Sequence, residues 1–306
     1  MSNIKNMAFE TAVQEWLTSV QTKVKATTYA QYTARLDKFI LPYFGETQMN
    51  DVTSDLLKDF VNEISGKGFN EKYIYDIIVQ LKMVTKYVSR TYGCPDPAMA
   101  IVLPKCERKS DSVVYDETFC RHLYEALTTE PDLTKAGILL TLFAGLKIGE
   151  LCALKWSDID LENGFLSVNK TLQRISAGKN TGLFLNDLKP DSGIRTIPLA
   201  PFLNEILSRF KNDGENFFLS GKETPIEPRT MQYRLRSFLK KEDLPDISFN
   251  ELRKLFINRC MSRGIDMVTL SDILGTSTAQ NTYMCCSKPT MDSKIQAINL
   301  ISEDVS

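Results

Sequence analysis

Residues 248–286 read SFNELRKLFINRCMSRGIDMVTLSDILGTSTAQNTYMCC, and their pattern predicts consecutive helices separated by glycines. Apolar residues recur at helical spacing over residues 252–260, which predicts a helix with one buried face. Gly264 fits the position just after that helix. Asp266 can cap a second apolar helix, and Gly275 can end it. We therefore expect two helices here, with a third short helix after them.

Arg253 lies at the edge of the helix face that is expected to be buried. A guanidinium in that position needs an anionic partner, because an unpaired charge away from water is costly. A structural ion pair would supply such a partner, and so would a bound phosphate. The residues of this helix leave both interpretations open.

The composition is that of an ordinary globular protein. The chain has 306 residues, enough for two domains, and its 43% hydrophobic and 25% charged residues are typical of folded domains. No N-terminal apolar segment reads as a signal peptide, and no apolar run is long enough to span a bilayer. We therefore expect a cytoplasmic protein with no membrane partner. The net charge of −1 does not indicate a nucleic-acid binder, so that function would need local basic clusters.

Two residue types restrict the chemistry. The seven cysteines form no CxxC pair, so neither a disulfide framework nor a zinc site is indicated, and no metal is expected. His122 is the single histidine, which limits acid–base catalysis because histidine is the side chain that titrates near neutral pH. We expect His122 to be a packing or surface residue.

Two folding units are expected. Residues 8–100 read as four amphipathic helices. Residues 101–112 lose this periodicity and gain proline and charge, as a linker does. The boundary is placed near Lys109, which gives a helical domain over residues 1–108 and a second domain over residues 109–306.

The second domain mixes helices with short strands. A buried helix is expected over residues 138–143, and Gly145 separates it from the next helical segment. Residues 165–169 read as a strand, and residues 181–199 read as two strands of a hairpin around a Pro-Asp-Ser-Gly turn. The expected fold class is mainly α, with an α+β C-terminal part that contains a small antiparallel sheet.

Two lysines stand at breaks in this pattern. Lys147 lies between the two helices that Gly145 separates, so its side chain could point into a cleft. Lys189 stands just before the turn, at the tip of the predicted hairpin. A lysine there is usually solvated, but it can also be a mobile finger that reaches a neighbouring site.

Two helices carry clustered positive charge. Lys82, Lys86 and Arg90 recur at every fourth residue, which places them on one face of the fourth helix. The second cluster, in a helix over residues 227–244, comprises Arg229, Arg234, Arg236, Lys240 and Lys241. Each cluster could be a solvated surface or a row of contacts with nucleic-acid phosphates.

Three segments together resemble the tyrosine recombinases, also called phage-type integrases. They are GLKIGELCALKWSDID at residues 145–160, the hairpin lysine before IRTIPL, and FNELRKLFINRCMSRGIDMVTLSDILGTSTAQNTYMCC at residues 249–286. The resemblance covers the second domain, and the first looks like the family's four-helix core-binding (SAM-like) domain. It implies a two-domain clamp around double-stranded DNA that uses no metal or other cofactor.

The resemblance also implies a chemistry. In this family a tyrosine attacks a DNA phosphodiester, forms a 3′-phosphotyrosyl link and releases a 5′-hydroxyl. Two arginines neutralise charge on the nonbridging oxygens. A hairpin lysine protonates the leaving oxygen, and histidines assist proton transfer and hold the phosphate.

Most of the family's catalytic positions are changed in this chain. The matching positions are Lys147 for the first arginine, Lys189 for the hairpin lysine, Asn250 and Thr276 for the two histidines, Arg253 for the second arginine, Lys254 for the last position of its box, and Cys286 for the nucleophile. Apart from Lys254 these are the six catalytic positions, of which Lys189 and Arg253 alone are unchanged. Lysine keeps the charge of the first arginine but loses its bidentate geometry. Lys254 is also expected to contact DNA.

The leading hypothesis is a DNA-binding protein without strand cleavage, and hence not an enzyme, that acts as a regulator or accessory factor in site-specific recombination or DNA integration. Its expected partners are DNA and an active recombinase. One alternative is an active recombinase that uses Tyr283, which lies three residues before Cys286 on roughly the same helix face. Another is a protein-interaction module that has lost DNA binding.

The C-terminal tail, residues 288–306, carries Ile295, Ile298 and Leu300 in a short amphipathic pattern. In the family such tails pack onto a neighbouring protomer, so the resemblance implies a homo-oligomer. A helix that packs within its own chain looks the same in sequence.

Overall fold

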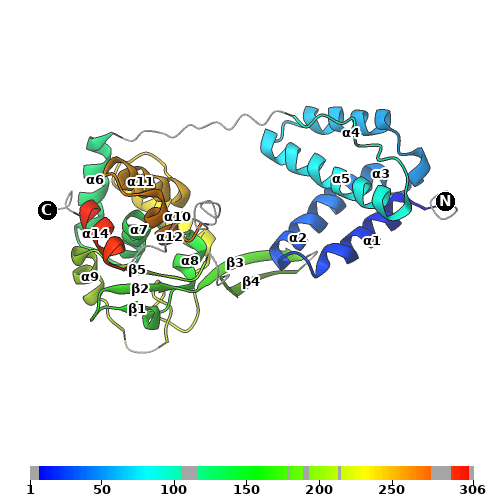
Figure 1. Ribbon diagram of the computed structural model, residues 1–306. Helices are drawn as coiled ribbons and strands as arrows, with labels where there is room; N and C mark the ends of the chain where they lie inside the picture. The colour runs from blue at the N-terminus through cyan, green and yellow to red at the C-terminus, as the bar shows by residue number, and fades with distance from the viewer. Residues whose placement is uncertain are drawn as a thin grey trace. The chain divides into compact units, whose positions relative to one another are not determined.

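The computed structural model (Figure 1) describes residues 7–104, 116–177, 180–188, 193–212, 215–276 and 291–302. The chain divides into two compact units, Met1–Asp111 with Ile175–Gly182, and Ser112–Arg174 with Leu183–Ser306. The predicted boundary near Lys109 lies outside the described residues. None of the described helices is both long enough and apolar enough to span a bilayer.

The first unit is helical. Its helices are α1 (Phe9–Gln21), α2 (Ala26–Arg35), α3 (Leu41–Phe44), α4 (Ser54–Gly66) and α5 (Glu71–Tyr92), with single turns at Leu36–Ile40 and Met49–Asp51. The turn Leu36–Ile40 joins α2 directly to α3, so these elements together form one nearly continuous helical segment, and with α1, α4 and α5 they account for the four predicted helices. Thr53 and Asn70 cap α4 and α5 with their side chains.

The second unit combines helices with two small sheets. Its helices are α6 (Glu117–Thr128), α7 (Leu133–Ala144), α8 (Ile148–Ala153), α9 (Pro201–Ser208), α10 (Pro228–Lys241), α11 (Phe249–Ser262), α12 (Met267–Leu274) and α14 (Met291–Ser302), with a short turn at Trp156–Asp158. The strands are β1 (Ile159–Asp160), β2 (Phe165–Val168), β3 (Lys170–Ala177), β4 (Asn180–Asp187) and β5 (Arg195–Pro198), and the adjoining ends of β3 and β4, Ile175–Gly182, are grouped with the first unit. The strands β1, β2 and β5 form one antiparallel sheet in that order, and β3 and β4 form the other.

The partners of β4 and β5 differ from the prediction. Both strands exist, but β4 pairs with β3 and β5 pairs with β2, so the predicted hairpin between them is wrong. The burial of β5 explains why this strand pairs with β2. Arg195 and Ile197 are both buried, and they lie opposite the buried residues Val168 and Leu166 of β2. This inward face completes the three-stranded sheet.

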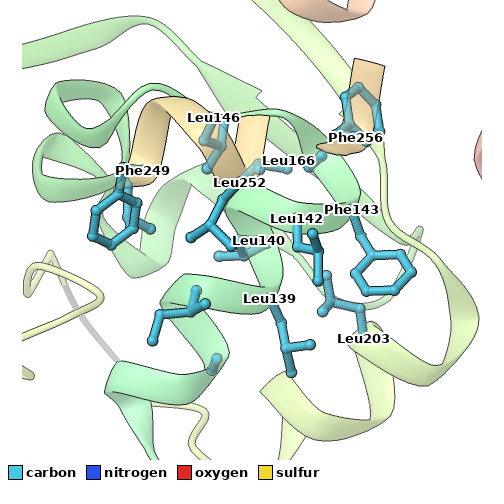
Figure 2. Packing of buried hydrophobic residues seen from close by; sticks show 14 of the residues in the cluster. Leu139, Leu140, Leu142, Phe143, Leu146, Leu166, Leu203, Phe249, Leu252 and Phe256 are labelled. Carbon is cyan, nitrogen blue, oxygen red and sulfur yellow. The ribbon is translucent and has the colours of Figure 1, made fainter. Parts of the chain in front are cut away.

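The helix α7 lies at the centre of the core, as its apolar sequence predicts. Its residues 136–144 are all buried. Figure 2 shows leucines of α7 and Phe143 close to Leu252 and Phe256 of α11. Gly145 ends α7 with a φ of +64°, and a Cβ at this position would lie 2.8 Å from Cδ1 of Phe256. A glycine is therefore needed where the end of α7 meets α11.

The helix α14 packs on its own unit. Ile298 and Ile301 are buried in the core, and the ammonium of Lys294 pairs with the carboxylate of Asp272 on α12. Leu300 is exposed. The described part of the C-terminal tail is thus a packing helix within the chain. A contact with a second protomer through this tail stays a prediction.

Candidate functional site

Arg253 is buried inside the second unit and binds two helix ends. Its residue surface is only 8% exposed, although it lies in the first half of the surface helix α11. Its guanidinium donates hydrogen bonds to the carbonyl oxygens of Gly145, at the end of α7, and of Leu274, at the end of α12, the second at 2.8 Å. The C-terminal end of a helix carries partial negative charge. Two helix ends therefore supply the partner that the sequence required of Arg253.

Glu150 and Arg195 form a buried ion pair in the same region. Arg195 starts β5, and its Nη2 and Nη1 lie 2.8 and 3.3 Å from the two carboxylate oxygens of Glu150 in α8. The Nε of Arg195 also donates to the carbonyl oxygen of Ile273 at 2.7 Å. The side chains of Arg195 and Glu150 are 3% and 1% exposed. The pair ties α8, β5 and the end of α12 together.

Lys147, the residue just before α8, adds a third cation. Its backbone N–H donates to Oε2 of Glu150 at 3.0 Å, and its Nζ lies 3.3 Å from Oε1. The side chain of Lys147 is 48% exposed, so it reaches from the buried carboxylate to the surface. Gly149 permits this arrangement, because a Cβ there would lie 2.9 Å from the carbonyl oxygen of Leu172 in β3.

These four residues, Lys147, Glu150, Arg195 and Arg253, are called the basic cluster below. Burial by itself would raise the pKa of Glu150, but the hydrogen bonds and charge of Arg195, helped by Lys147, hold that pKa below its usual range. Burial lowers the pKa of Arg253, but the guanidinium stays charged at neutral pH. Two cations thus contact one carboxylate, and a third, Arg253, lies near enough to feel its charge. The excess positive charge suits an anionic ligand such as a phosphate.

The sequence interpretation missed Glu150 and Arg195. A signal for Arg195 existed, because the strand IRTIPL alternates so that this arginine shares a face with the apolar Ile197. A charge on a buried strand face needs a partner. That partner, Glu150, is 45 residues away in sequence, so no local pattern connects the two.

The other positions discussed from the sequence that the structure describes are less enclosed. Asn250 and Lys254 are exposed on α11, and Thr276 is half-buried just after the end of α12. His122 is exposed on α6, as a surface residue would be. The predicted positions outside the described residues are Lys189, Tyr283 and Cys286.

The helix α10 has a basic exposed face. The residues that follow one another on this face at helical spacing are Arg229, Tyr233, Arg236 and Lys240. Tyr233, which the sequence interpretation missed, is 71% exposed between the charges. Arg234 is half-buried instead and donates to Oγ1 of Thr134 at 3.4 Å. Lys241 is exposed at the end of the helix.

The predicted basic row on α5 is partly engaged within the first unit. Lys86 and Arg90 are exposed. Lys82 donates from its Nζ to the carbonyl oxygen of Ile101 at 2.7 Å, so it holds the segment that follows the helix. Two of the three predicted contacts are therefore on open surface.

Two family patterns match the chain. The one described as phage integrase, N-terminal SAM-like domain, matches residues 8–65, and the one described as phage integrase family matches residues 116–285. The chain belongs to the phage integrase family. The predicted fold, a SAM-like helical domain followed by a tyrosine-recombinase domain with small antiparallel sheets, is confirmed for this integrase-family protein.

Relatives of this family member carry recombinase names. Tyrosine recombinase XerC of Bacillus licheniformis is 26% identical over 93% of this chain and 92% of its own length. Tyrosine recombinase XerA of Pyrococcus furiosus is 25% identical over 82% of each chain. The prediction that the chain is not an enzyme is wrong, because its family and named relatives are recombinases, which are enzymes. That prediction rested on counting replaced side chains, and such a count does not measure the activity that remains.

Solved integrase structures share the fold. The Tn1549 transposon integrase in complex with transposon right end DNA superimposes with a TM-score of 0.73 at 21% identity, over 93% of this chain and 97% of that chain. A lambda integrase dimer bound to a COC′ core site gives 0.65 at 18% identity, over 93% and 100%. At these identities the likeness concerns the fold.

Proposed function

We propose that this chain is a site-specific recombinase that cuts and rejoins double-stranded DNA, with Tyr283 as its nucleophile. The basic cluster is the observation that carries the proposal. Arg253 is fixed on two helix ends, Lys147 is fixed on Glu150, and Arg195 balances that carboxylate. Positive charge is thereby held in place before any ligand arrives, which is the condition for stabilising a phosphate as its charge changes during reaction.

The roles within the cluster follow from the family positions that its residues take. Lys147 and Arg253 take the positions of the family's two arginines, so they are expected to contact the nonbridging oxygens of the phosphate that is attacked. Lysine binds as a point charge, so the contact of Lys147 with the phosphate is expected to be weaker than that of an arginine. Arg195 is already bound to Glu150 and to the carbonyl of Ile273, so its role is to hold these groups.

Tyr283 is preferred to Cys286 as the nucleophile. The family match runs to residue 285, so it includes Tyr283 and ends before Cys286. A thiol is also much shorter than a phenol and would leave a phosphorothiolate link. Attack by the Tyr283 hydroxyl forms a 3′-phosphotyrosyl bond and releases a 5′-hydroxyl, and the reverse attack rejoins the strand. Lys189 stands at the position of the family's proton donor.

The exposed basic faces fit a DNA duplex. The α10 face, together with Lys86 and Arg90 of α5 and Lys254 of α11, offers cations that can track phosphates. Integrases of the same fold were solved with DNA, and the lambda integrase was solved both as a dimer and as a tetramer. We expect the two domains, over residues 1–108 and 109–306, to hold duplex DNA. The partner protomer is a second copy or another active recombinase, and the C-terminal tail is the expected contact.

Trapping a covalent DNA adduct tests this proposal. The DNA is the site that the protein occupies in its own genome, mapped by crosslinking and sequencing, and synthesised with a nick beside the cut so that the released end diffuses away. Wild-type protein, Tyr283→Phe and Cys286→Ser are compared on a denaturing gel. We expect the adduct with wild type and Cys286→Ser and none with Tyr283→Phe. No adduct from any of the three would overturn the proposal.

A further inference from the structure

Lys147 brings a group to this site that an arginine would not supply. A guanidinium does not release its proton in proteins, whereas an ammonium does. Histidine, a common proton carrier, is scarce in this chain, because the single one, His122, lies on α6. The replacement of arginine by lysine therefore keeps a positive charge and adds a proton that can be transferred.

The ammonium of Lys147 is held in a defined place. Its Nζ lies 3.3 Å from Oε1 of Glu150, and its backbone N–H lies 3.0 Å from Oε2 of the same carboxylate. Glu150 is itself held by Arg195 through contacts of 2.8 and 3.3 Å. Because the Lys147 side chain is 48% exposed, a DNA phosphate can reach it without displacing the buried pair.

The charged groups around Lys147 act in both directions. Glu150 on α8 favours the protonated amine, whereas Arg195 on β5 and Arg253 on α11 favour the neutral amine. Burial acts with the two arginines, and together they lower the pKa of Lys147. A proton donor works best when its pKa lies close to the working pH. The contact with Glu150 keeps the amine charged in the resting protein, and the arginines make its proton easier to transfer.

We propose that Lys147 is a catalytic residue that donates a proton to the leaving 5′-oxygen when the strand is cut, an assignment that rests on the proposed recombinase function. The bond from Tyr283 Oη to phosphorus forms while the bond from phosphorus to the 5′-oxygen breaks. The proton of the tyrosine passes to water, and a proton of Nζ passes to the 5′-oxygen. When the 5′-hydroxyl attacks phosphorus to rejoin the strand, the neutral amine takes its proton back. The bond from phosphorus to Tyr283 Oη breaks, and the tyrosinate regains its proton from water.

A DNA strand with sulfur in place of the bridging 5′-oxygen separates proton donation from charge stabilisation. A thiol has a pKa near 8.5, far below that of an alcohol, so a thiolate leaves without a proton. The key variant is Lys147→Arg, which keeps the charge and loses the donor. We expect it to cut ordinary DNA about 10²-fold or more slowly than wild type. We also expect it to cut the sulfur-containing DNA at close to the wild-type rate.

Two further readouts make the test decisive. Cleavage of ordinary DNA by wild type should slow as rising pH removes the proton from Lys147, and this fall should be absent with sulfur-containing DNA. Lys189→Arg is measured in parallel, because the resemblance gives that lysine the donor role. If sulfur-containing DNA restores cutting by Lys189→Arg but not by Lys147→Arg, the assignment to Lys147 is overturned.

Cutting of ordinary DNA by Lys147→Arg at the wild-type rate or faster would also overturn the assignment to Lys147, since arginine restores the bidentate contact with the phosphate without donating a proton. A failure to rescue this variant with sulfur-containing DNA, while its thermal unfolding matches wild type, counts equally against the assignment. No adduct from wild type on either DNA would instead overturn the recombinase proposal, and this assignment with it.

Discussion

Arg195 and Arg253 bind consecutive carbonyl oxygens at the end of one helix. Arg195 donates from Nε to Ile273 at 2.7 Å, and Arg253 donates from Nη2 to Leu274 at 2.8 Å. Gly275 ends α12 with a φ of +60°, so these carbonyls lie in its last turn, where carbonyls have no partner within the helix. The end of α12 thus positions one guanidinium of the proposed phosphate site and one that supports it.

Removing Arg195 should destabilise the second unit strongly. Arg195→Met leaves the carboxylate of Glu150 buried without its main partner, which is expected to cost about 3–5 kcal/mol of unfolding free energy. Each unit contains one of the two tryptophans, Trp16 and Trp156. In a Trp16→Phe background, fluorescence of Trp156 during denaturant unfolding reports the second unit alone.

Arg236→Met is the matched control for that substitution. Arg236 pairs with Asp246 at 3.8 Å, with 70% and 71% of the two side chains exposed. An exposed pair of this kind contributes little, so the change should stay within about 0.5 kcal/mol. Equal effects of the two substitutions would show that the Glu150–Arg195 pair does not hold the unit together.

The Glu150 carboxylate should also give the stability a dependence on pH. Its pKa is lowered in the folded state, so its contribution is complete above the unfolded value, near 4.3, and is lost as pH falls through the folded value. The difference in unfolding free energy between wild type and Glu150→Gln should therefore be large at neutral pH and shrink in acid. Asp55→Asn, at an exposed carboxylate beside Lys58, should change this profile little. A difference independent of pH would contradict the ionised pair.

Gly149 should not tolerate a side chain. An alanine Cβ would lie 2.6 Å from Oγ1 of Thr171 and 2.9 Å from the carbonyl oxygen of Leu172, and the backbone oxygen cannot move aside. Gly149→Ala is expected to cost about 1–3 kcal/mol. Gly66→Ala on α4, where no atom lies within 4 Å of the new Cβ, should instead stabilise the first unit by about 0.4–1 kcal/mol. Thermal unfolding followed at Trp156 and Trp16, respectively, compares the two.

The exposed face of α10 should account for part of the salt dependence of DNA binding. Each lost phosphate contact is expected to reduce the slope of log affinity against log salt by about 0.9. Arg229→Ala and Lys240→Ala should each do so, whereas Arg234→Ala should leave the slope unchanged because that side chain is bound to Thr134. The same measurement applies to Lys86 and Arg90 on α5. Affinity without salt dependence in wild type would favour a protein-interaction module.

The local features of the fold were predictable because they depend on neighbouring residues. Asp266 caps α12 by accepting hydrogen bonds from the backbones of Val268 and Thr269, both at 2.9 Å, and Gly264 and Gly275 adopt positive φ after their helices. Each of these signals lies within four residues of the structure that it determines. The buried run of α7 was equally clear, because a continuous apolar segment has no exposed face.

The features that the sequence did not reveal depend on distant partners. The strand β5 pairs with β2, which lies much earlier in the chain, rather than with its neighbour β4, and strand pairing is decided by burial over the whole sheet. Glu150 is a partner of both Arg195 and Lys147, but its importance is visible only when β5 lies beside α8. The same limit affected the prediction of inactivity, since a family's residue types describe the site without the contacts that support it.

Identifying the residue that carries the DNA tests the central proposal most directly. The trapped adduct is digested with protease and nuclease, and the modified peptide from residues 277–290 is sequenced by mass spectrometry. We predict a nucleotide linked through phosphate to Tyr283. A nucleotide on Cys286, or no modified peptide from a reaction that binds its DNA fully, would contradict the account.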